Sequence, residues 1–236
     1  MEFPDIDLVI HDLVDGNAKY IDDYLAIYQE LFPQYVRYTP VMRQRAEVRV
    51  DQSANEKWHQ WLLVMQGKPV GIVGFLYNRK RNIGLLMDFA IYPDSRNTRI
   101  NGRITFSNFA LNLSMRQLIE DARENGHESP ICMAAEVEYP ALVRKYIQYG
   151  YVKFPVEYLE PPYTPELEKV GDKILEVDNP ADYERMFVGA FHIPGYPFDP
   201  VAPEIVKTVL LAFLEDHYHL PMDHWLIQKV IQEIPV

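Results

Sequence analysis

The clearest hydrophobic pattern in this sequence runs from Ile83 to Ile91, where apolar residues occupy both of the alternating faces. Asp88 is the only charged residue inside the run. A segment that is apolar on both sides is typical of a strand buried on both faces. A polar segment follows, and from Ile104 onward apolar residues recur at the spacing of one helix face. The pattern therefore predicts a central strand, a loop and an amphipathic helix, in this order.

The chain before this strand reads as two helices and two further strands. The apolar face of the first helix consists of Ile21, Tyr24, Leu25, Tyr28, Leu31 and Phe32. A mixed segment around Pro40 predicts the second helix. Residues 59–66 and 70–77 read as strands separated by short turns, which predicts an antiparallel meander leading into the central strand. Gly71 and Gly74 lie inside the second of these strands, where glycine marks a bulge or a close approach by another group.

The chain after the amphipathic helix continues the α/β pattern. Asn125 and Gly126 are typical of a helix end. A strand over 131–137, a helix and a short strand at Tyr151 follow. The segment after Tyr151 then reads as two strands joined by a proline-rich connection, a predicted final hairpin that leads up to residue 178.

The segments beyond residue 178 read as helical. Residues 179–191, 203–220 and 223–234 have helical patterns, and the last two are amphipathic. Their apolar faces need cover, which the sheet or a second subunit could supply, or they could form a lid over an acceptor cleft. We therefore expect one domain over residues 1–178 and a helical C-terminal extension over 179–236.

The net charge of −11 and a pI near 5.1 disfavour nucleic acid and anionic membranes as partners. An acidic surface suits a cationic amine substrate, although solubility is the commoner reason for acidity. No apolar run reaches the roughly 18 residues needed to cross a bilayer. The acidic start of the chain does not fit a signal peptide. The single cysteine, Cys132, lies in an apolar strand, so we expect a reducing, cytoplasmic location.

Several common kinds of site lack their sequence signatures here. His217, His219 and His224 lie close to acidic residues, but their spacing matches no familiar zinc pattern, and we interpret them as polar residues at a helix end. Ser107 and Ser114 lack the G-x-S-x-G context of a serine nucleophile. The G-K-[ST] triplet of a P-loop is missing as well. We therefore expect no metal, no serine nucleophile and no P-loop.

Two motifs resemble the GNAT superfamily of N-acyltransferases. The pyrophosphate-binding loop of that family reads Arg/Gln-x-x-Gly-x-Gly/Ala. The segment from Arg99 to Ile104 matches it at the arginine and the first glycine and departs from it at the last position. The family's closing helix ends Tyr-x-x-x-Gly-Phe, which resembles Tyr146, Gly150 and Tyr151, with tyrosine in place of phenylalanine. The two motifs occur in the family's order, and the resemblance extends over about residues 18–178.

The resemblance implies an α/β fold with a mixed, mainly antiparallel sheet flanked by helices. It also implies acetyl-coenzyme A or another acyl-coenzyme A as co-substrate. The pyrophosphate would lie at the loop and the following helix start, where free N–H groups and the helix dipole favour an anion. The residues assigned in this way to cofactor binding are Phe89, Ala90, Ile91, Arg96, Arg99, Asn101, Gly102, Arg103 and Ile104.

Three residues are candidates for catalysis. Asp88 would be the general base that takes a proton from the acceptor ammonium group, and Glu136 on the neighbouring strand is the second choice. The motif assigns Tyr146 as the general acid that protonates the departing thiolate. The alternative role for Asp88 is to cap a bulge or pair with an arginine, and the alternative for Tyr146 is packing among the many tyrosines of this chain.

The resulting hypothesis is transfer of an acyl group to a primary amine of a small molecule or a peptide. Neither nucleic acid nor a membrane is an expected partner, and a homodimer formed through the C-terminal helices stays open. Because the loop motif is degenerate, a GNAT-like domain that binds a ligand or partner without catalysis is the main alternative. Transfer of a longer acyl chain is another.

Overall fold

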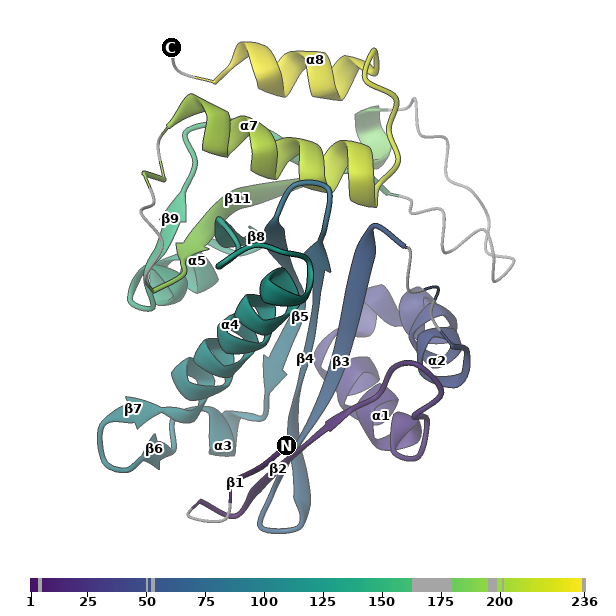
Figure 1. Ribbon diagram of the computed structural model, residues 1–236, viewed down its shortest axis with the longest axis vertical. Coiled ribbons are helices and arrows are strands. Elements are labelled where there is room, and N and C mark those ends of the chain that lie inside the picture. Colours follow the sequence, from purple (N-terminus) through teal and green to yellow (C-terminus); the bar gives the residue numbers. More distant parts are fainter. Residues whose placement is uncertain are drawn as a thin grey trace. The chain divides into compact units, whose positions relative to one another are not determined.

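The structure is a computed structural model that describes residues 1–3, 6–49, 51, 54–162, 180–194, 199–200 and 202–234 (Figure 1). The chain divides into two compact units. Unit 1 consists of Met1–Tyr77 and Leu86–Asp121, and unit 2 consists of Asn78–Leu85 and Ala122–Val236.

Unit 1 is built on five neighbouring strands in the order β1-β2-β3-β4-β5. Their bounds are Glu2–Phe3 for β1, Leu8–Asp12 for β2, Glu56–Met65 for β3, Lys68–Asn78 for β4 and Ile83–Ile91 for β5. The β1–β2 and β2–β3 pairings are antiparallel. The predicted central strand therefore coincides with β5, and the two strands predicted before it correspond to β3 and β4.

Helices cover both faces of the unit 1 strands (Figure 1). On one face lie α1 (Ile21–Leu31), the 3-10 helix η2 (Pro33–Tyr38) and α2 (Thr39–Glu47), and on the other lies α4 (Phe106–Glu124). Leu62 on β3 and Ile72 on β4 are fully buried in the core beneath α1 and α2. Trp61 and Phe75 occupy neighbouring positions and pack edge to face, with ring centroids 4.8 Å apart. Because successive side chains of a strand point to opposite faces, β3 and β4 contribute apolar residues to a core on each side of the sheet.

Both glycines of β4 mark a close approach, as one of the two sequence interpretations predicted. A methyl group at Gly71 would lie 2.6 Å from the carbonyl oxygen of Ala90. A methyl group at Gly74 would lie 2.7 Å from Oδ2 of Asp88. Cβ atoms do not approach other heavy atoms so closely. At Gly71 the obstructing atom is backbone, so β4 and β5 can keep their packing there only with glycine, whereas at Gly74 the Asp88 carboxylate would have to move aside.

A buried histidine ties β2, β3 and α4 together in unit 1. His59 Nδ1 lies 2.5 Å from an Asp12 oxygen and its Nε2 lies 3.0 Å from an Asp121 oxygen. Lys57 also binds Asp121, at 2.8 Å. Burial by itself would lower the pKa of His59, but the hydrogen bonds to the two carboxylates outweigh it and raise the pKa to about 9. His59 is therefore a buried imidazolium at neutral pH.

We expect the free energy of unfolding to fall between about pH 6.5 and pH 9.5. The folded-state pKa of His59 is raised above the unfolded value of 6.5, so its contribution is complete below pH 6.5 and is lost as pH rises through about 9. The full loss corresponds to roughly 3 kcal/mol. Urea unfolding across this pH range measures it. His59→Gln should flatten the curve, while His127→Gln, at an exposed histidine, should not; parallel curves for the wild type and His59→Gln would contradict the assignment.

Unit 2 is built around β11 (Glu184–His192). This strand pairs antiparallel with β8 (Cys132–Val137), β9 (Tyr151–Lys153) and β10 (Tyr158–Glu160). The short helix α5 (Pro140–Ile147) connects β8 to β9. The predicted fold class is confirmed, because the chain is a mixed α/β structure with a mainly antiparallel sheet flanked by helices.

The helix predicted over residues 179–191 is wrong. A single 3-10 turn, η3 (Pro180–Asp182), is followed by β11. The alternation of β11 buries Met186, Val188 and Ala190, and its hydrogen-bonding edges are taken by strands from earlier in the chain. The second strand of the predicted final hairpin and the predicted domain boundary at residue 178 lie outside the described residues.

The C-terminal helices agree with the prediction more closely. Helix α7 (Pro203–Leu211) continues into a π-helical turn, η4 (Ala212–His217), and α8 (Trp225–Gln232) follows. An ion cluster fixes η4 to the turn between β4 and β5. Arg81 donates to both Glu215 and Asp216, and Lys80 Nζ lies 2.8 Å from Asp216. Burial would raise the pKa of Asp216, but these cations hold it below its usual value. The C-terminal segment is thus tied by charge to the rest of unit 2.

None of the helices in the described part of the chain combines the length and the apolar character needed to cross a bilayer.

Candidate active site

The segment that follows β5 forms a small hairpin in place of an open loop. A short helix, α3 (Pro93–Arg96), comes first, and then β6 (Arg99–Ile100) pairs antiparallel with β7 (Ile104–Thr105). Asn101 and Gly102 turn the chain with φ of 49° and 67°. The N–H of Arg103 donates to the carbonyl of Ile100 at 3.0 Å. A Cβ at Gly102 would meet no atom within 4 Å, so crowding is not the reason for glycine at this position. The positive φ of the turn is what favours glycine there.

The amphipathic helix starts later than the sequence predicted. Ile104 lies in β7, and α4 begins at Phe106 because the hairpin uses the two preceding residues. The Thr105 hydroxyl accepts a hydrogen bond from the N–H of Asn108 at 3.3 Å, and the N–H of Phe106 donates to the carbonyl of Thr98 at 2.8 Å. Part of the donor capacity at the helix start is therefore already used within the chain.

Three exposed arginines lie in and beside this hairpin. Arg96, Arg99 and Arg103 are exposed, and none of them forms an ion pair with a carboxylate of the described residues. Arg99 donates through Nη1 to the carbonyl of Arg103 at 3.0 Å, which holds its guanidinium close to the turn. Guanidinium groups that lack a carboxylate partner can bind phosphate with two parallel hydrogen bonds. This is the chemistry that a pyrophosphate or phosphate ester would need.

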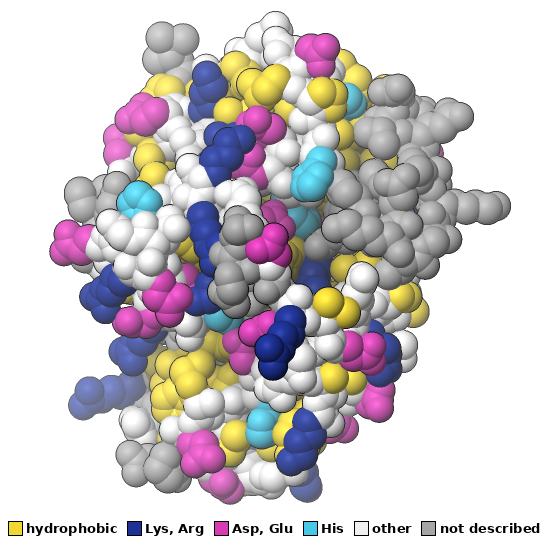
Figure 2. All heavy atoms as spheres, turned by 45° about the vertical axis from the view of Figure 1, so that its right-hand side comes forward, with side chains coloured by type: hydrophobic (Ala, Val, Ile, Leu, Met, Phe, Trp, Pro, Cys, Tyr) yellow, Lys and Arg dark blue, Asp and Glu magenta, His cyan; other side chains and the backbone are white. Residues whose placement is uncertain are grey.

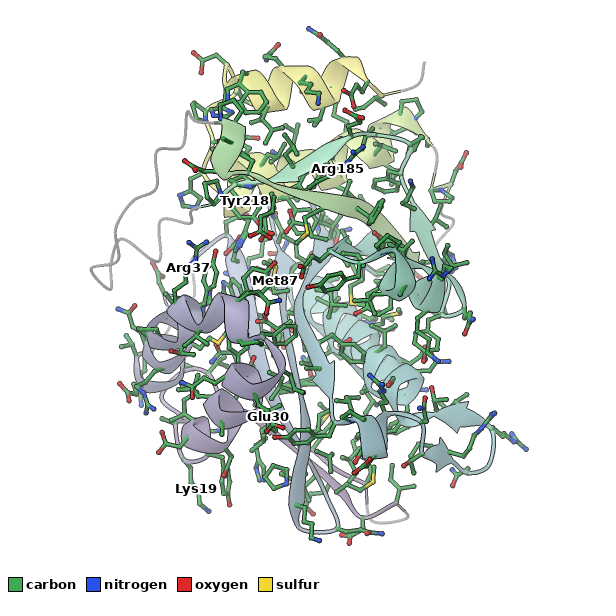
Figure 3. All side chains as sticks on the ribbon, turned by 180° about the vertical axis from the view of Figure 1, so that it is seen from behind. Lys19, Glu30, Arg37, Met87, Arg185 and Tyr218 are labelled. Atoms are coloured by element: carbon green, nitrogen blue, oxygen red, sulfur yellow. The ribbon has the colours of Figure 1, made fainter. Side chains whose placement is uncertain are left out.

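The end of β5 supplies the other predicted cofactor residues. Ala90 and Ile91 are buried against Gly71, and Phe89 is half-buried. Tyr92, the next residue, donates from its hydroxyl to Glu30 of α1 at 2.8 Å. Glu30 is labelled in Figure 3. That bond fixes the chain where it leaves the strand, one residue before α3.

Asp88 lies in the middle of β5 and is half-buried. Its carboxylate faces Gly74 of β4 and the hydroxyl of Tyr24 of α1, both of which border the same small space. Burial first, and then the charge of Asp88, raise the pKa of Tyr24 and that of Tyr28, so both phenols stay neutral. The candidate base is therefore set against two protonated tyrosines of α1.

Glu136, the second candidate base, lies in unit 2 and its two carboxylate oxygens are both engaged. Tyr158 of β10 donates to Oε1, and Tyr218, which follows η4 (Figure 3), donates to Oε2 at 2.8 Å. The Tyr218 hydroxyl also lies 3.1 Å from Glu160. Burial raises the pKa of Glu136, and the tyrosine hydrogen bonds partly offset that rise. In this arrangement Glu136 joins β8 to β10 and to the C-terminal segment.

Tyr146 is buried in an aromatic cluster of unit 2. Its ring packs edge to face on Phe191 at 5.2 Å and on Tyr151 at 6.0 Å between centroids. Burial raises the pKa of its hydroxyl, so the group is protonated at neutral pH. Tyr151 in turn donates to the carbonyl of Ala135 on β8 at 3.2 Å. The location fits packing and leaves the role of general acid as a prediction.

The predicted site residues therefore fall into two groups. Asp88 and all of the predicted cofactor residues belong to unit 1, whereas Glu136 and Tyr146 belong to unit 2. The sequence interpretation missed Tyr24 and Tyr218 as polar partners, since Tyr24 was read only as part of an apolar helix face. Gly74 was the one signal in the sequence that pointed to the space beside Asp88.

Unit 2 also carries an open pocket of about 360 Å³ beside β10 and β11. Its lining includes Lys153, Arg185, Phe187 and Glu233. Arg185 binds Glu157 at 3.2 Å, and Lys153 lies over the Phe187 ring at 5.2 Å. None of the predicted catalytic or cofactor residues lines it.

Acidic and basic side chains are interspersed on the face drawn in Figure 2. Among the described residues, no group of three or more His, Cys, Asp and Glu side chains is arranged to hold a metal ion. The arginines in and beside the β6–β7 hairpin are a small cationic group that could bind an anion.

The chain is similar to solved structures of acetyltransferases. One is described as an acetyltransferase of the GNAT family from Bacteroides thetaiotaomicron, with 14% identity and a TM-score of 0.47 over 90% of this chain and 99% of that chain. Another is a chimera of the spermidine N-acetyltransferase SpeG from Vibrio cholerae, with 12% identity and a TM-score of 0.43 over 79% and 95%. A GNAT family acetyltransferase from Elizabethkingia anophelis with acetyl-CoA bound has 12% identity and a TM-score of 0.38 over 79% and 98%.

No protein-family model and no curated protein matches the sequence. The solved structures named above are acetyltransferases, and two of them carry the name of the family that the motifs resemble.

Proposed function

We propose that this chain is an N-acyltransferase of the GNAT superfamily, which transfers an acyl group, acetyl in the simplest case, from an acyl-coenzyme A to a primary amine. The observation that carries the proposal is the group of three exposed arginines, free of carboxylate partners among the described residues, at the hairpin between β5 and α4. The motif resemblance of the same segment supports it.

The donor set of this segment fits the phosphates of coenzyme A. Arg96, Arg99 and Arg103 would hold the pyrophosphate, and Gly102 would keep the turn that carries them. The co-substrate supplies the acyl group as a thioester. We assign Asp88 to take a proton from the acceptor ammonium, directly or through water, so that the free amine can form the new C–N bond as the C–S bond breaks. We assign Tyr146 to give a proton to the departing sulfur.

The acceptor that we propose is a primary amine on a small molecule or a peptide. Asp88 is half-buried and gives the acceptor side a carboxylate, which suits an ammonium group through charge and hydrogen bonding. A homodimer through the C-terminal helices and a cytoplasmic location belong to the same proposal.

One observation favours the alternative of binding without catalysis. The β6–β7 hairpin and the Thr105 hydrogen bond use part of the donor capacity that an open phosphate-binding loop would offer. A domain of this kind would bind its ligand and leave the acyl group in place. Turnover and binding must therefore be measured separately.

We expect Arg99→Ala to weaken binding of acetyl-coenzyme A by roughly tenfold to a hundredfold, because one charged contact to phosphate is worth about 1.5–3 kcal/mol. Isothermal titration calorimetry measures the affinity, and the rise in melting temperature at saturating ligand gives an independent value. The matched control is Arg116→Ala, at an exposed arginine on α4 of the same unit.

The outcomes of this experiment separate the two candidate functions. Binding that is weakened by Arg99→Ala and accompanied by acyl transfer to an amine supports the enzyme. The same binding without transfer to a panel of primary amines supports the binding domain. Absence of heat and of any thermal shift in the wild-type protein would exclude the enzyme and favour a domain that binds a different ligand or a partner.

A further inference from the structure

The space beside Asp88 is shaped by the absence of a side chain at Gly74. A methyl group at that position would lie 2.7 Å from Asp88 Oδ2 and 3.2 Å from the hydroxyl oxygen of Tyr24. Both oxygens therefore lie within about a hydrogen-bond length of one point. Strand β4 thus leaves open the gap across which the phenol of α1 and the carboxylate of β5 face each other.

The Tyr24 hydroxyl is the unusual member of this pair. Tyr24 has no exposed surface, and its hydroxyl has no hydrogen-bond partner among the described residues. A buried hydroxyl without a partner costs about 1–3 kcal/mol, so such groups are rare unless they serve a purpose. Burial raises the pKa of this phenol most, and among the charges that act on it Asp88 has a larger effect than Arg45 or Asp12.

The other charged and titratable groups that act on the phenols of Tyr24 and Tyr28 come from four elements. As with Tyr24, burial and then the charge of Asp88 raise the pKa of Tyr28 of α1. Tyr38 of η2 and Arg45 of α2 act on Tyr28, and Asp12 of β2 acts on Tyr24. Of these groups, Tyr24 is the one that contacts the Gly74 gap together with Asp88.

We propose that Tyr24 is a positioning residue that donates its hydroxyl proton to the Asp88 carboxylate across the Gly74 gap and thereby keeps Asp88 ionised and oriented as the base. Rotation of the two side chains would bring the donor to the carboxylate, and the missing side chain at Gly74 leaves room for it. The hydrogen bond is a property of unit 1 alone, whereas its catalytic consequence rests on the proposed acyl transfer.

The test is the titration of the Asp88 carboxyl, followed by NMR on protein labelled with ¹³C at the aspartate carboxyl carbon and assigned with Asp88→Asn. Tyr24→Phe removes the donor and keeps the ring, so the titration midpoint of Asp88 should rise by about one pH unit. Gly74→Ala pushes the carboxylate away from the phenol and should move it in the same direction. Tyr20→Phe, which removes a hydroxyl from a ring at the start of the same helix, should leave it unchanged.

An Asp88 titration that is identical in the wild type and in Tyr24→Phe overturns the proposal. This measurement needs no turnover, so it stands even if the chain transfers no acyl group. Where acyl transfer is observed, the acidic limb of the pH profile of kcat/KM should shift upward in Tyr24→Phe by the same amount. A purely structural role of Tyr24 would lower stability and leave that limb where it is.

Discussion

Asp88→Asn is expected to lower kcat by roughly 10²- to 10⁴-fold, which is the usual contribution of a positioned general base. Asparagine keeps the shape of the side chain in the space beside Gly74 but cannot take a proton from the acceptor ammonium. Affinity for acetyl-coenzyme A should change little, since the arginines of the hairpin and not Asp88 are assigned to the phosphates. Steady-state kinetics with a primary amine as a function of pH measures the effect, and the acidic limb of the wild-type profile should disappear.

The matched control is Glu136→Gln. Both oxygens of Glu136 accept hydrogen bonds from Tyr158 and Tyr218, so we expect this variant to lose stability and to keep most of its kcat. The reverse result, with Asp88→Asn fully active and Glu136→Gln inactive, would transfer the role of base to Glu136. Full activity of both variants across the pH range would remove the carboxylate base from the mechanism.

The order of elements in unit 1 could be predicted because each element depends on its own local pattern. The run from Ile83 to Ile91 is apolar on both faces and became β5 at those bounds. Gly71 and Gly74 predicted a close approach, which the backbone at Ala90 and the carboxylate of Asp88 supply. Each of these signals comes from residues close together in the sequence, so it can be recognised before the distant partners in the fold are known.

Strand β11 shows where local patterns fail. The segment from Glu184 to His192 was predicted as helix, yet it pairs with β8 on one edge and with β9 and β10 on the other. These partners lie many residues earlier in the chain, and strand pairing of this kind overrides a weak helical pattern. The mutual packing also requires Gly189, where a methyl group would lie 2.2 Å from the carbonyl oxygen of Val152.

The polar partners of the candidate catalytic residues were out of reach for the same reason. Tyr158 and Tyr218 are 22 and 82 residues from Glu136 in the chain, and nothing near Glu136 in the sequence predicts them. Nothing near Asp88 in the sequence predicts Tyr24 either, because Tyr24 lies on the apolar face of α1, far from β5 in the chain. Sequence motifs identify the residue type at a site, whereas the fold decides which group stands opposite it.

The assignment of Tyr146 as general acid makes the second large prediction. Its hydroxyl stays protonated at neutral pH because burial raises its pKa, which is the state that a proton donor needs. Its ring also packs on Tyr151 and Phe191, so the structure gives the residue a reason to be there without any chemistry. Removing the hydroxyl while keeping the ring separates the two roles.

Tyr146→Phe is therefore expected to lower kcat by roughly a hundredfold or more, with the melting temperature and the affinity for acetyl-coenzyme A nearly unchanged. The matched control is Tyr151→Phe, which removes a neighbouring hydroxyl that donates to the Ala135 carbonyl; it should cost about 1 kcal/mol of stability and leave kcat intact. An acyl donor with a more acidic thiol should restore much of the activity of Tyr146→Phe, since its thiolate leaves without a proton. Unaltered kcat in Tyr146→Phe would show that water or another group protonates the sulfur, and that the tyrosine serves the aromatic cluster alone.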